Sequence, residues 1–393
     1  MENKIEKKIV NNYGSFDLVF KKAKGSTMWT CDGKKYIDFI AGIGVNCLGH
    51  NYKPLVKAIS EQAKNQIHIS NYYFSDVGLD FADALLEITG FERGYFGNSG
   101  AEANECAIKL ARKYGELNGG SKRKTIVTLE SSFHGRTLAT LTATGQQRFH
   151  PECFAPYPQG FKTIKANDYE AIETAFDDTT AAFMVECIQG EGGVNLLNPD
   201  WIQKASELAR KAGAIVIADE VQTGIGRTGT FLANDTLGFN PEVVTLAKGI
   251  AGGIPMGACL FRGKARDVFV AGDHQSTFAG NPLACAAGLV VAATVSQPEF
   301  LERVNHAGDY IRGTISSWNL PIVKDVRGKG LMIGTQIDSG IKPFDIEVKC
   351  LESGLCTTTA GSDVVRFLPP LNISDKEIEE GLAIYKKVLE FFC

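Results

Sequence analysis

The sequence predicts an α/β protein with a mostly parallel central sheet and a smaller α+β domain. Short apolar runs rich in β-branched residues alternate with helical patterns between about residues 90 and 265, and this order is typical of parallel strands joined by crossover helices. About the first 50 and about the last 100 residues lack the alternation, so we expect both chain ends to build the smaller domain. The chain has 393 residues, and at roughly 150 residues per domain this length suggests two or three domains.

Five runs in the alternating region predict the strands of the sheet. They are Thr125–Glu130, Ala181–Glu186, Ala214–Glu220, Val243–Lys248 and Ala258–Arg262. Four of the five are almost entirely apolar, as expected of strands that are covered by helices on both faces.

Two segments predict amphipathic helices through their spacing and their end signals. The first, Asp200–Ala212, is followed by Gly213, a residue type that often closes a helix. The second, Ser374–Phe392, carries an apolar stripe, and Ser374 with Glu377 has the spacing of a capping box.

A third helix is expected inside a stretch without charged side chains. The stretch His274–Pro298 contains no Asp, Glu, Lys or Arg. Gly280-Asn281-Pro282 interrupts it, which disfavours a membrane span. We therefore expect a buried helix over Leu283–Val295.

The composition disfavours several classes of protein. Lys plus Arg number 41 and Asp plus Glu number 45, so the net charge is −4, whereas a nucleic-acid-binding protein needs a clustered positive excess. The ten cysteines form no CxxC pair and the six histidines form no HxH or HExxH pattern, so we expect no metal site. The start, MENKIEKKIV, lacks the apolar core of a secretory signal, and we expect a cytoplasmic protein with reduced thiols.

The segment Gly97–Glu102 predicts a helix start that could hold an anion. Apolar residues follow at helical spacing, and Ser99 with Glu102 gives a second capping-box pattern. Backbone N–H groups at such a start have no partner within the helix and suit a phosphate. A plain loop and cap explains this segment equally well when it is taken alone.

A second glycine-rich segment, Gly224–Gly229, matches the GxGxxG pattern of dinucleotide sites and follows the predicted strand Ala214–Glu220. That fingerprint requires a helix to open at the glycines. Asn234-Asp235, Gly238 and Asn240-Pro241 come next, and they leave no room for a helix of useful length. A nicotinamide-dependent oxidoreductase is therefore only a distant alternative.

Two ionisable residues stand at the carboxyl ends of predicted strands, where open α/β sheets bind their ligands. Asp219 ends one apolar run, and Lys248 ends another before a glycine-rich loop. Poor solvation would lower the pKa of the lysine and free its amine as a nucleophile, although a solvated surface lysine is the commoner case. A helix start that binds anions, a carboxylate and a reactive lysine are together the parts of a pyridoxal phosphate site.

The chain resembles the class III aminotransferases of PLP fold type I, and within them the acetylornithine aminotransferases, over nearly its whole length. Nine segments in the family's order carry the resemblance. They are DGKKYIDF from Asp32, AGIGVNCLGH ending at His50, NSGAEANE from Asn98, SFHGRT from Ser132, IQGEGG from Ile188, DEVQTGIGRTG from Asp219, AKGIAGGIPMGA from Ala247, STFAGNPL from Ser276 and RFLPPL from Arg366. The resemblance implies a large cofactor-binding domain over residues 51–285 and a small domain formed by residues 1–50 and 286–393.

The resemblance also implies the residues that bind pyridoxal 5'-phosphate. Lys248 is implied to form the Schiff base with the cofactor and to move the proton, and Asp219 to hold the pyridine nitrogen. The other implied contacts are Val221 and Phe133 on the two ring faces, Gln222 on the ring hydroxyl, and Gly100, Ala101 and the partner subunit's Thr277 on the phosphate.

The implied activity is a ping-pong transfer of the δ-amino group of N2-acetylornithine to 2-oxoglutarate. It gives N-acetylglutamate 5-semialdehyde and glutamate, as in arginine biosynthesis, and it is carried out by a homodimer with shared active sites. Arg136 is implied to hold the carboxylate of acetylornithine. Arg366 is implied to receive the α-carboxylate of glutamate, with Glu191 as its switchable counter-ion, and Ser276 is implied to touch the substrate.

Some positions and some related activities keep the choice of substrate open. Cys187 stands where the family usually has proline, and Ile43 stands where ornithine aminotransferases carry tyrosine, which weighs against free ornithine. Other class III ω-aminotransferases, acting on succinylornithine, succinyl-diaminopimelate, ornithine, lysine or 4-aminobutyrate, are the main alternative. A catalytically inactive relative is disfavoured because Lys248, Asp219 and Arg136 are all present.

Overall fold

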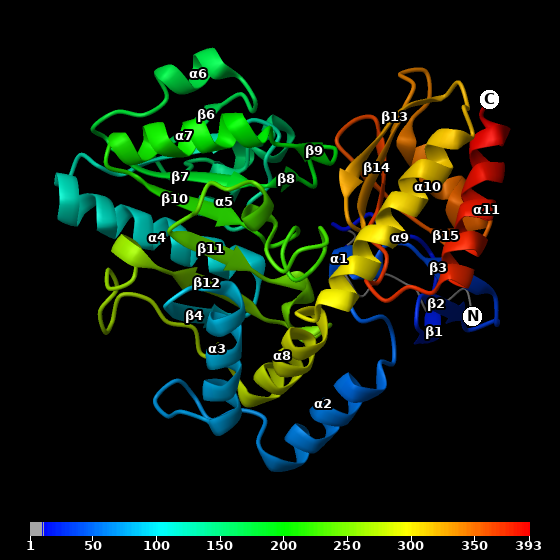
Figure 1. Ribbon diagram of the computed structural model, residues 1–393, viewed down its shortest axis with the longest axis horizontal. Coiled ribbons are helices and arrows are strands. Elements are labelled where there is room, and N and C mark those ends of the chain that lie inside the picture. The colour runs from blue at the N-terminus through cyan, green and yellow to red at the C-terminus, as the bar shows by residue number, and fades with distance from the viewer. Residues whose placement is uncertain (1–9, 11) are drawn as a thin grey trace.

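The computed structural model describes residues 10 and 12–393 and has two lobes (Figure 1). The larger lobe contains a seven-stranded sheet, in which only the second strand from one edge runs antiparallel to its neighbours. In spatial order, the strands are β4 (Arg93–Gly97), β12 (Gly257–Phe261), β11 (Val243–Leu246), β10 (Ile215–Asp219), β7 (Thr180–Glu186), β5 (Thr125–Leu129) and β6 (Phe161–Ile164). The predicted mostly parallel sheet is confirmed, and the five predicted strands lie within two residues of their expected limits.

Alternation along each strand divides the apolar side chains of this sheet between two faces. In β10, Ile215 and Ile217 pack with the core that includes α4 (Gly100–Gly119), whereas Val216 and Ala218 belong to the core that includes α7 (Pro199–Lys211). Both faces are therefore covered, and β7, β10, β11 and β12 are buried throughout. This burial explains why their sequences are continuous apolar runs rather than alternating ones.

The second lobe contains the first described strands and the C-terminus (Figure 1). A four-stranded sheet has the order β1 (Phe20–Lys24), β2 (Thr27–Thr30), β3 (Lys35–Asp38) and β15 (Leu355–Cys356), and β15 runs parallel to β3. A second four-stranded sheet has the order β13 (Val323–Lys329), β14 (Met332–Ile337), β17 (Val364–Phe367) and β16 (Thr358–Ala360). The expected α+β domain formed by both chain ends is thus confirmed, and the residue limits of the domains remain a prediction.

The remaining elements connect the lobes or cover them. β8 (Ile188–Gln189) and β9 (Asn195–Leu196) form a short hairpin. The other helices are α1 (Ala41–Gly44), α2 (Lys53–Asn65), α3 (Asp76–Thr89), α5 (Leu138–Ala143), α6 (Tyr169–Glu173), α8 (Pro282–Val295), α9 (Pro298–Ser317), α10 (Pro343–Glu352) and α11 (Asp375–Phe391). The predicted helices over Asp200–Ala212 and Ser374–Phe392 correspond to α7 and α11, and the capping box of Ser374 with Glu377 is formed.

The uncharged stretch forms a helix of the protein core, as predicted. In α8, Ala284, Cys285, Ala287 and Val295 are fully shielded from solvent. Among the described residues, no single helix is long and apolar enough to cross a membrane, and α8 and α9 reach that length only as a pair bent by 74°. Of the amino-terminal segment MENKIEKKIV, on which the prediction about a secretory signal rests, only Val10 lies within the described residues.

The GxGxxG segment connects the two lobes instead of opening a helix. Between β10 and β11 the described chain contains only a single 3₁₀ turn, Ala233–Thr236. The guanidinium group of Arg227 is buried and donates to the carbonyl oxygens of Leu331 at 3.0 Å and Pro369 at 2.6 Å. An added Cβ at Gly229 would lie 1.9 Å from Asn305, so close packing explains this glycine. The segment therefore has a structural role in this fold, and the prediction that no helix of useful length follows its glycines is confirmed for the described chain.

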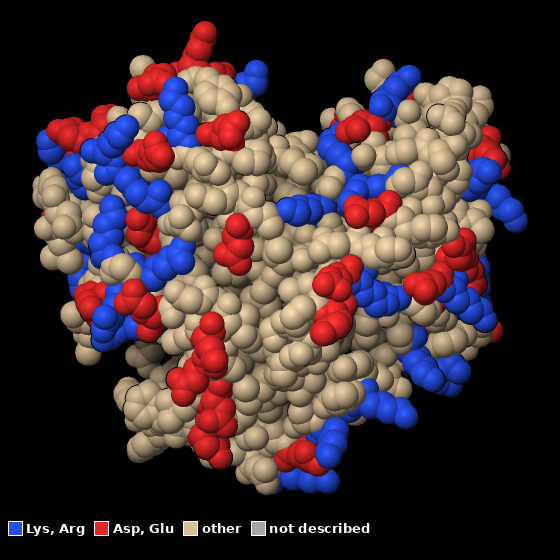
Figure 2. All heavy atoms as spheres, viewed as in Figure 1, with Lys and Arg blue, Asp and Glu red and all other residues tan. Residues whose placement is uncertain are grey.

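Charge on the viewed surface is mixed. Figure 2 shows Lys and Arg side chains interspersed with Asp and Glu over both lobes of that face. The viewed face therefore has no continuous positive surface of the kind that binds a polyanion.

Candidate functional site

A cavity of about 430 Å³ lies at the carboxyl ends of β7, β10 and β11. This is the edge of the sheet at which open α/β folds bind ligands. The cavity brings together eight residues singled out from the sequence, namely Gly100, Ala101, Phe133, Arg136, Asp219, Val221, Gln222 and Lys248.

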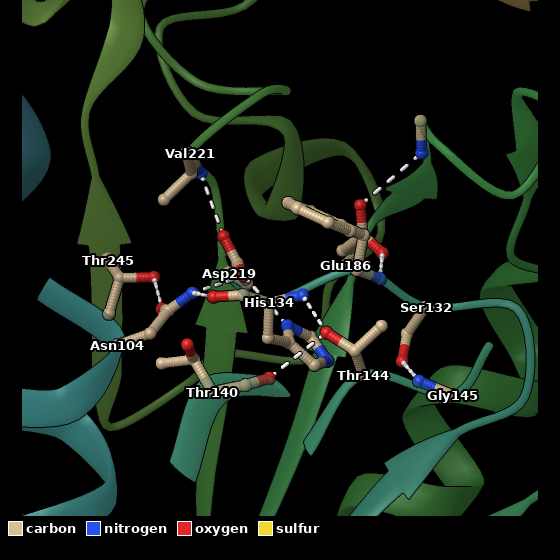
Figure 3. A network of polar contacts seen from close by, with 12 residues as sticks. Asn104, Ser132, His134, Thr140, Thr144, Gly145, Glu186, Asp219, Val221 and Thr245 are labelled. Atoms are coloured by element: carbon tan, nitrogen blue, oxygen red, sulfur yellow. Dashed lines mark hydrogen bonds and ion pairs between the residues drawn. The ribbon is translucent and has the colours of Figure 1, made fainter. Parts of the chain in front are cut away.

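The carboxylate of Asp219 lies in a network of buried polar groups, which we call the aspartate network (Asn104, His134, Asp219 and Thr245; Figure 3). Asp219 Oδ2 accepts from Asn104 Nδ2 and from His134 Nδ1, each at 2.7 Å, and Oδ1 accepts from the N–H of Val221 at 3.0 Å. Thr245 Oγ1 donates to Asn104 Oδ1 at 2.7 Å, which fixes the orientation of that amide. Three donors thus stabilise a negative charge at this position.

The sequence reasoning missed Asn104 and His134, although both lie inside segments that carried the family resemblance. The feature of the sequence that could have indicated them is that each is a polar residue among apolar or glycine-rich neighbours. His134 Nε2 is buried and has no hydrogen-bond partner among the described residues.

Lys248 borders the same cavity as this network and has an unusual backbone. Its φ of 47° places a residue other than glycine in the left-handed region, where strain is often found at functional sites. Burial lowers the pKa of Lys248 to about 8, an effect that Glu191 opposes and Arg366 reinforces. A larger fraction of its amine is therefore neutral at pH 7 than for an ordinary lysine.

The start of α4 supplies unpaired N–H groups to the cavity. Ser99 Oγ accepts from the N–H of Glu102 at 3.2 Å, and Ser99 O accepts from the N–H of Ala103 at 3.1 Å. These bonds leave the N–H groups of Gly100 and Ala101, at the positive end of a 20-residue helix, available for an anion. At Gly100 an added Cβ would lie 2.7 Å from Val221, so a larger residue would collide with the cavity wall.

The capping box expected at this helix start is only half formed. The carboxylate of Glu102 does not return to Ser99 but accepts from the backbone N–H of Asn98 at 2.5 Å and from its side-chain amide at 2.8 Å. The prediction was wrong on this point because Asn98 offers two donors where Ser99 offers one.

Arg366, Glu191 and Gln222 form a second group, which we call the arginine cluster. Arg366 is 1% exposed, and its Nη1 donates to Glu191 Oε1 at 2.6 Å and to Gln222 Oε1 at 3.0 Å. Gln222 Nε2 donates to Glu191 Oε1 at 3.3 Å. Although burial acts to raise the pKa of Glu191, the positive charges of Arg366 and Lys248 hold that pKa below its usual value. An ionised glutamate therefore neutralises Arg366 in this structure.

Arg136 is held by aromatic rings rather than by an acid. Its guanidinium carbon lies 4.0 Å from the ring centre of Phe149 and 5.5 Å from that of Phe133. Within the described residues it forms no salt bridge, and it is exposed at the cavity. Stacking orients a guanidinium without cancelling its charge, so this side chain is suited to bind a carboxylate from solution.

Ser276 and Thr277 do not line the cavity of their own chain. Ser276 Oγ accepts from Asn98 Nδ2 at 2.8 Å, and Asn71 Nδ2 donates to the carbonyl of Ser276 at 2.6 Å. Thr277 is exposed. Both residues lie beside the exposed aromatic segment Tyr72–Phe74, and their implied contacts with cofactor and substrate remain predictions.

Comparison with known proteins gives the same family throughout. The model of the family "Aminotransferase class-III" matches residues 9–389. An acetylornithine aminotransferase from Caldanaerobacter subterraneus subsp. tengcongensis is 43% identical over 386 residues, which is 98% of each chain.

Two solved structures have the same fold. The N-acetylornithine aminotransferase from Stenotrophomonas maltophilia K279a superposes with a TM-score of 0.85 at 34% identity, covering 97% of this chain and 98% of that one. An ornithine aminotransferase from Toxoplasma gondii, described with partial occupancy of PLP at its active site, gives a TM-score of 0.90 at 32% identity, with 96% and 91% of the chains covered.

Proposed function

The chain belongs to the class-III aminotransferases, which are pyridoxal-phosphate-dependent transaminases, and on this premise we propose that its amino donor is N2-acetylornithine. The reaction transfers the δ-amino group to 2-oxoglutarate and yields N-acetylglutamate 5-semialdehyde and glutamate. The observation that carries the proposal is a pair of arginines in different states. Arg366 is neutralised by Glu191, whereas Arg136, which borders the cavity with Lys248, has no acidic partner among the described residues.

The residues of the cavity fit pyridoxal phosphate. The free N–H groups of Gly100 and Ala101 suit the phosphate, Asp219 suits a protonated ring nitrogen, and Phe133 and Val221 provide apolar surfaces for the two ring faces. When bound, the cofactor supplies an aldehyde that links to amines and a ring that accepts electrons. Lys248 supplies the amine for that link.

Lys248 also carries the proton of the reaction. Its Nζ would take a proton from Cδ of the donor and hold it for its return, so one base would serve both directions of the proton transfer. The lowered pKa of about 8 brings this base close to the working pH, where proton transfer in both directions is efficient. Gln222 borders the cavity, and its predicted bond to the ring hydroxyl can use the second hydrogen of its amide.

The two arginines divide the two substrates between them. Arg136 binds the α-carboxylate of acetylornithine, because its charge has no acidic partner and its planar fork suits a carboxylate. Arg366 binds the α-carboxylate of glutamate or 2-oxoglutarate after Glu191 turns away, and Glu191 neutralises it again when the donor carries no charge there. This exchange lets one cavity accept two different acids in turn.

The proposal includes a homodimer in the cytoplasm. Tyr72, Tyr73 and Phe74 are 81%, 73% and 86% exposed, and three adjacent exposed aromatic rings indicate a surface that another chain covers. Asn71 joins this segment to Ser276 and Thr277, so the same surface would carry Thr277 to the partner's phosphate site. All ten cysteines are free, in keeping with a reducing compartment.

A comparison of donors tests the proposal. With 2-oxoglutarate as acceptor, kcat/KM is measured for N-acetylornithine, ornithine, N-succinylornithine and 4-aminobutyrate. We expect N-acetylornithine to be preferred over ornithine and 4-aminobutyrate, and a clear preference for either of these would contradict the proposal. The variant Lys248→Ala is the control, because all transamination should depend on this amine.

A further inference from the structure

Glu186 is a buried carboxyl group to which the reaction described above gives no role. It is the last residue of β7, pairs with Asp219 in the sheet register and is 4% exposed. Its side chain borders the same cavity as Lys248. A buried carboxylate is costly unless hydrogen-bond donors surround it, so its partners indicate what it does.

The two oxygens of Glu186 accept from backbone N–H groups in two different segments. Oε1 accepts from the N–H of Phe133 at 2.8 Å, and Oε2 accepts from the N–H of Gly190 at 3.3 Å. Figure 3 shows the Glu186 carboxyl group beside the aspartate network, with both bonds drawn. One side chain therefore connects the loop after β5 with the turn after β8.

Each of these segments carries a residue that contacts substrate in the proposed function. The loop after β5 carries Arg136 three residues beyond Phe133, and Gly190 is followed directly by Glu191. The segments also touch elsewhere, since Gln189 Nε2 donates to the carbonyl of Glu130 at 2.6 Å. The position of Arg136 relative to Glu191 thus depends on how firmly these segments are joined.

Four ionisable groups face Glu186 or adjoin it. Burial raises the pKa of Glu186 to about 7, an effect that His134 opposes and Asp219 reinforces. Glu186 in turn acts to raise the pKa of Lys248, which lines the same cavity. The next residue, Cys187, points toward Glu220, with Sγ 3.6 Å from Oε1.

We propose that Glu186 is a positioning residue. Its ionised carboxylate holds the Phe133–Arg136 loop and the Gly190–Glu191 turn in fixed positions relative to each other, so that the carboxylate-binding groups are correctly placed for both substrates. The proposal rests on the proposed function for the roles of Arg136 and Glu191. Glu186 contacts the backbone of both segments and is argued to position their side chains.

The proposal predicts a pH dependence with a definite sign. The ionised carboxylate accepts strongly through both oxygens, whereas protonation turns one of them into a hydroxyl, which is a weaker acceptor. Because the pKa of Glu186 is raised to about 7, its carboxylate is ionised and holds both segments above this pH. The two hydrogen bonds weaken as the pH falls through 7 and the carboxylate becomes protonated. The kcat/KM of both half-reactions should decline in the same interval.

The variants Glu186→Gln and Glu186→Asp test this role in the holoenzyme. In Glu186→Gln, one backbone N–H faces an amide NH₂ group, so we expect kcat/KM to fall by about tenfold to a hundredfold for both substrates, through displaced binding groups. The part of the decline of kcat/KM near pH 7 that comes from protonation of Glu186 should disappear in this variant. Glu186→Asp keeps the negative charge but has a shorter side chain, so it should lose activity while its kcat/KM still declines at acid pH.

Visible circular dichroism of the bound cofactor provides a readout that does not depend on turnover. The wild-type signal should change between pH 6 and pH 8, because Phe133 contacts the cofactor ring and is held by Glu186, and the signal of Glu186→Gln should not change. Glu130→Gln is the matched control, since Glu130 lies on the same loop and is exposed; it should behave like wild type. Thermal unfolding establishes that each variant is folded.

The proposal is overturned if kcat/KM of Glu186→Gln declines at acid pH as in wild type and its KM values are those of wild type. It is also overturned if the visible circular dichroism of this variant changes with pH as in wild type. If Glu186→Gln does not fold, the test rests on Glu186→Asp. The proposal is then overturned if the KM values of Glu186→Asp for both substrates equal those of the wild-type enzyme. Failure of the proposed donor is a separate result. Wild-type enzyme would then be inactive with N-acetylornithine, while the glutamate half-reaction and the circular dichroism still report on Glu186.

Discussion

Asp219 of the aspartate network and Gln222 of the arginine cluster border the same cavity, but the two groups hold their charges in different ways. Asp219 accepts from a histidine, an asparagine and a backbone N–H, and the asparagine is itself fixed by Thr245. Arg366 is neutralised by another charged side chain, Glu191, whose side chain is 25% exposed. The first arrangement has no partner that can leave, whereas the second has a partner that a substrate carboxylate can replace. A fixed charge suits a resident cofactor, and a replaceable one suits substrates that alternate.

The largest expected effect comes from removing the fixed charge. Asp219→Asn puts an amide between two donors, His134 and Asn104, and removes the negative charge on which a protonated ring nitrogen depends. We expect kcat to fall by about 10³-fold for both half-reactions. Stopped-flow measurement of each half-reaction checks this, and equal losses in both are required. A loss confined to one substrate would place Asp219 outside the shared chemistry.

The second expected effect separates the two substrates. Arg366→Gln should raise KM for glutamate and 2-oxoglutarate by about tenfold to a hundredfold, because a carboxylate loses its charged donor. Arg136→Gln should do the same for N-acetylornithine and leave KM for glutamate little changed. Steady-state kinetics with each substrate varied in turn measures both. The same KM change in both variants would show that the arginines do not divide the substrates.

A third effect concerns the pH dependence of Lys248. Only the neutral amine attacks an aldehyde, and the pKa of this amine is lowered to about 8 by burial. The rate of cofactor reconstitution into the apoenzyme should therefore rise about tenfold per pH unit below pH 8 and level off above it. Visible absorbance during reconstitution follows this rate. A plateau that begins only near pH 10 would indicate an ordinary, solvated lysine.

The smallest expected effect comes from the replaceable partner itself. Glu191→Gln frees Arg366 from its counter-ion, so KM for glutamate should fall by a few-fold while the acetylornithine half-reaction slows. Glu191 also acts to raise the pKa of Lys248, so in this variant the reconstitution profile should shift to lower pH. A shift to higher pH would be contrary to the sign of the interaction between these two groups.

Local patterns in the sequence predicted much of the fold and the central pair of the site. Apolar runs predicted β5, β7, β10, β11 and β12 to within two residues, because a strand covered on both faces has few alternatives to an apolar sequence. Asp219 and Lys248 could be singled out because a charged residue next to a buried apolar strand is unfavourable unless it has a partner or a function. The failure of Gly224–Gly229 to open a helix followed from the breakers that come after it.

The sequence could not predict in the same way which side chains pair with one another through hydrogen bonds and salt bridges. The half-formed capping box at Ser99 depended on the donors that Asn98 offers to Glu102. Asn104 reaches Asp219 from 115 positions away, and Arg366 reaches Glu191 from 175 positions away. Nothing in the local sequence ranks such partners against one another.

The sequence by itself thus determined where most strands and helices lie, and it singled out two ionisable residues, Asp219 and Lys248, that line the cavity. These features depend on burial and on caps, which neighbouring residues specify. Only the tertiary structure decided that Asp219 has fixed donors, that Arg366 has a replaceable acid, and that Glu186 joins two loops. A hydrogen bond depends on distance and direction to within a fraction of an ångström, and that geometry exists only after the sheet and the two chain ends have packed together.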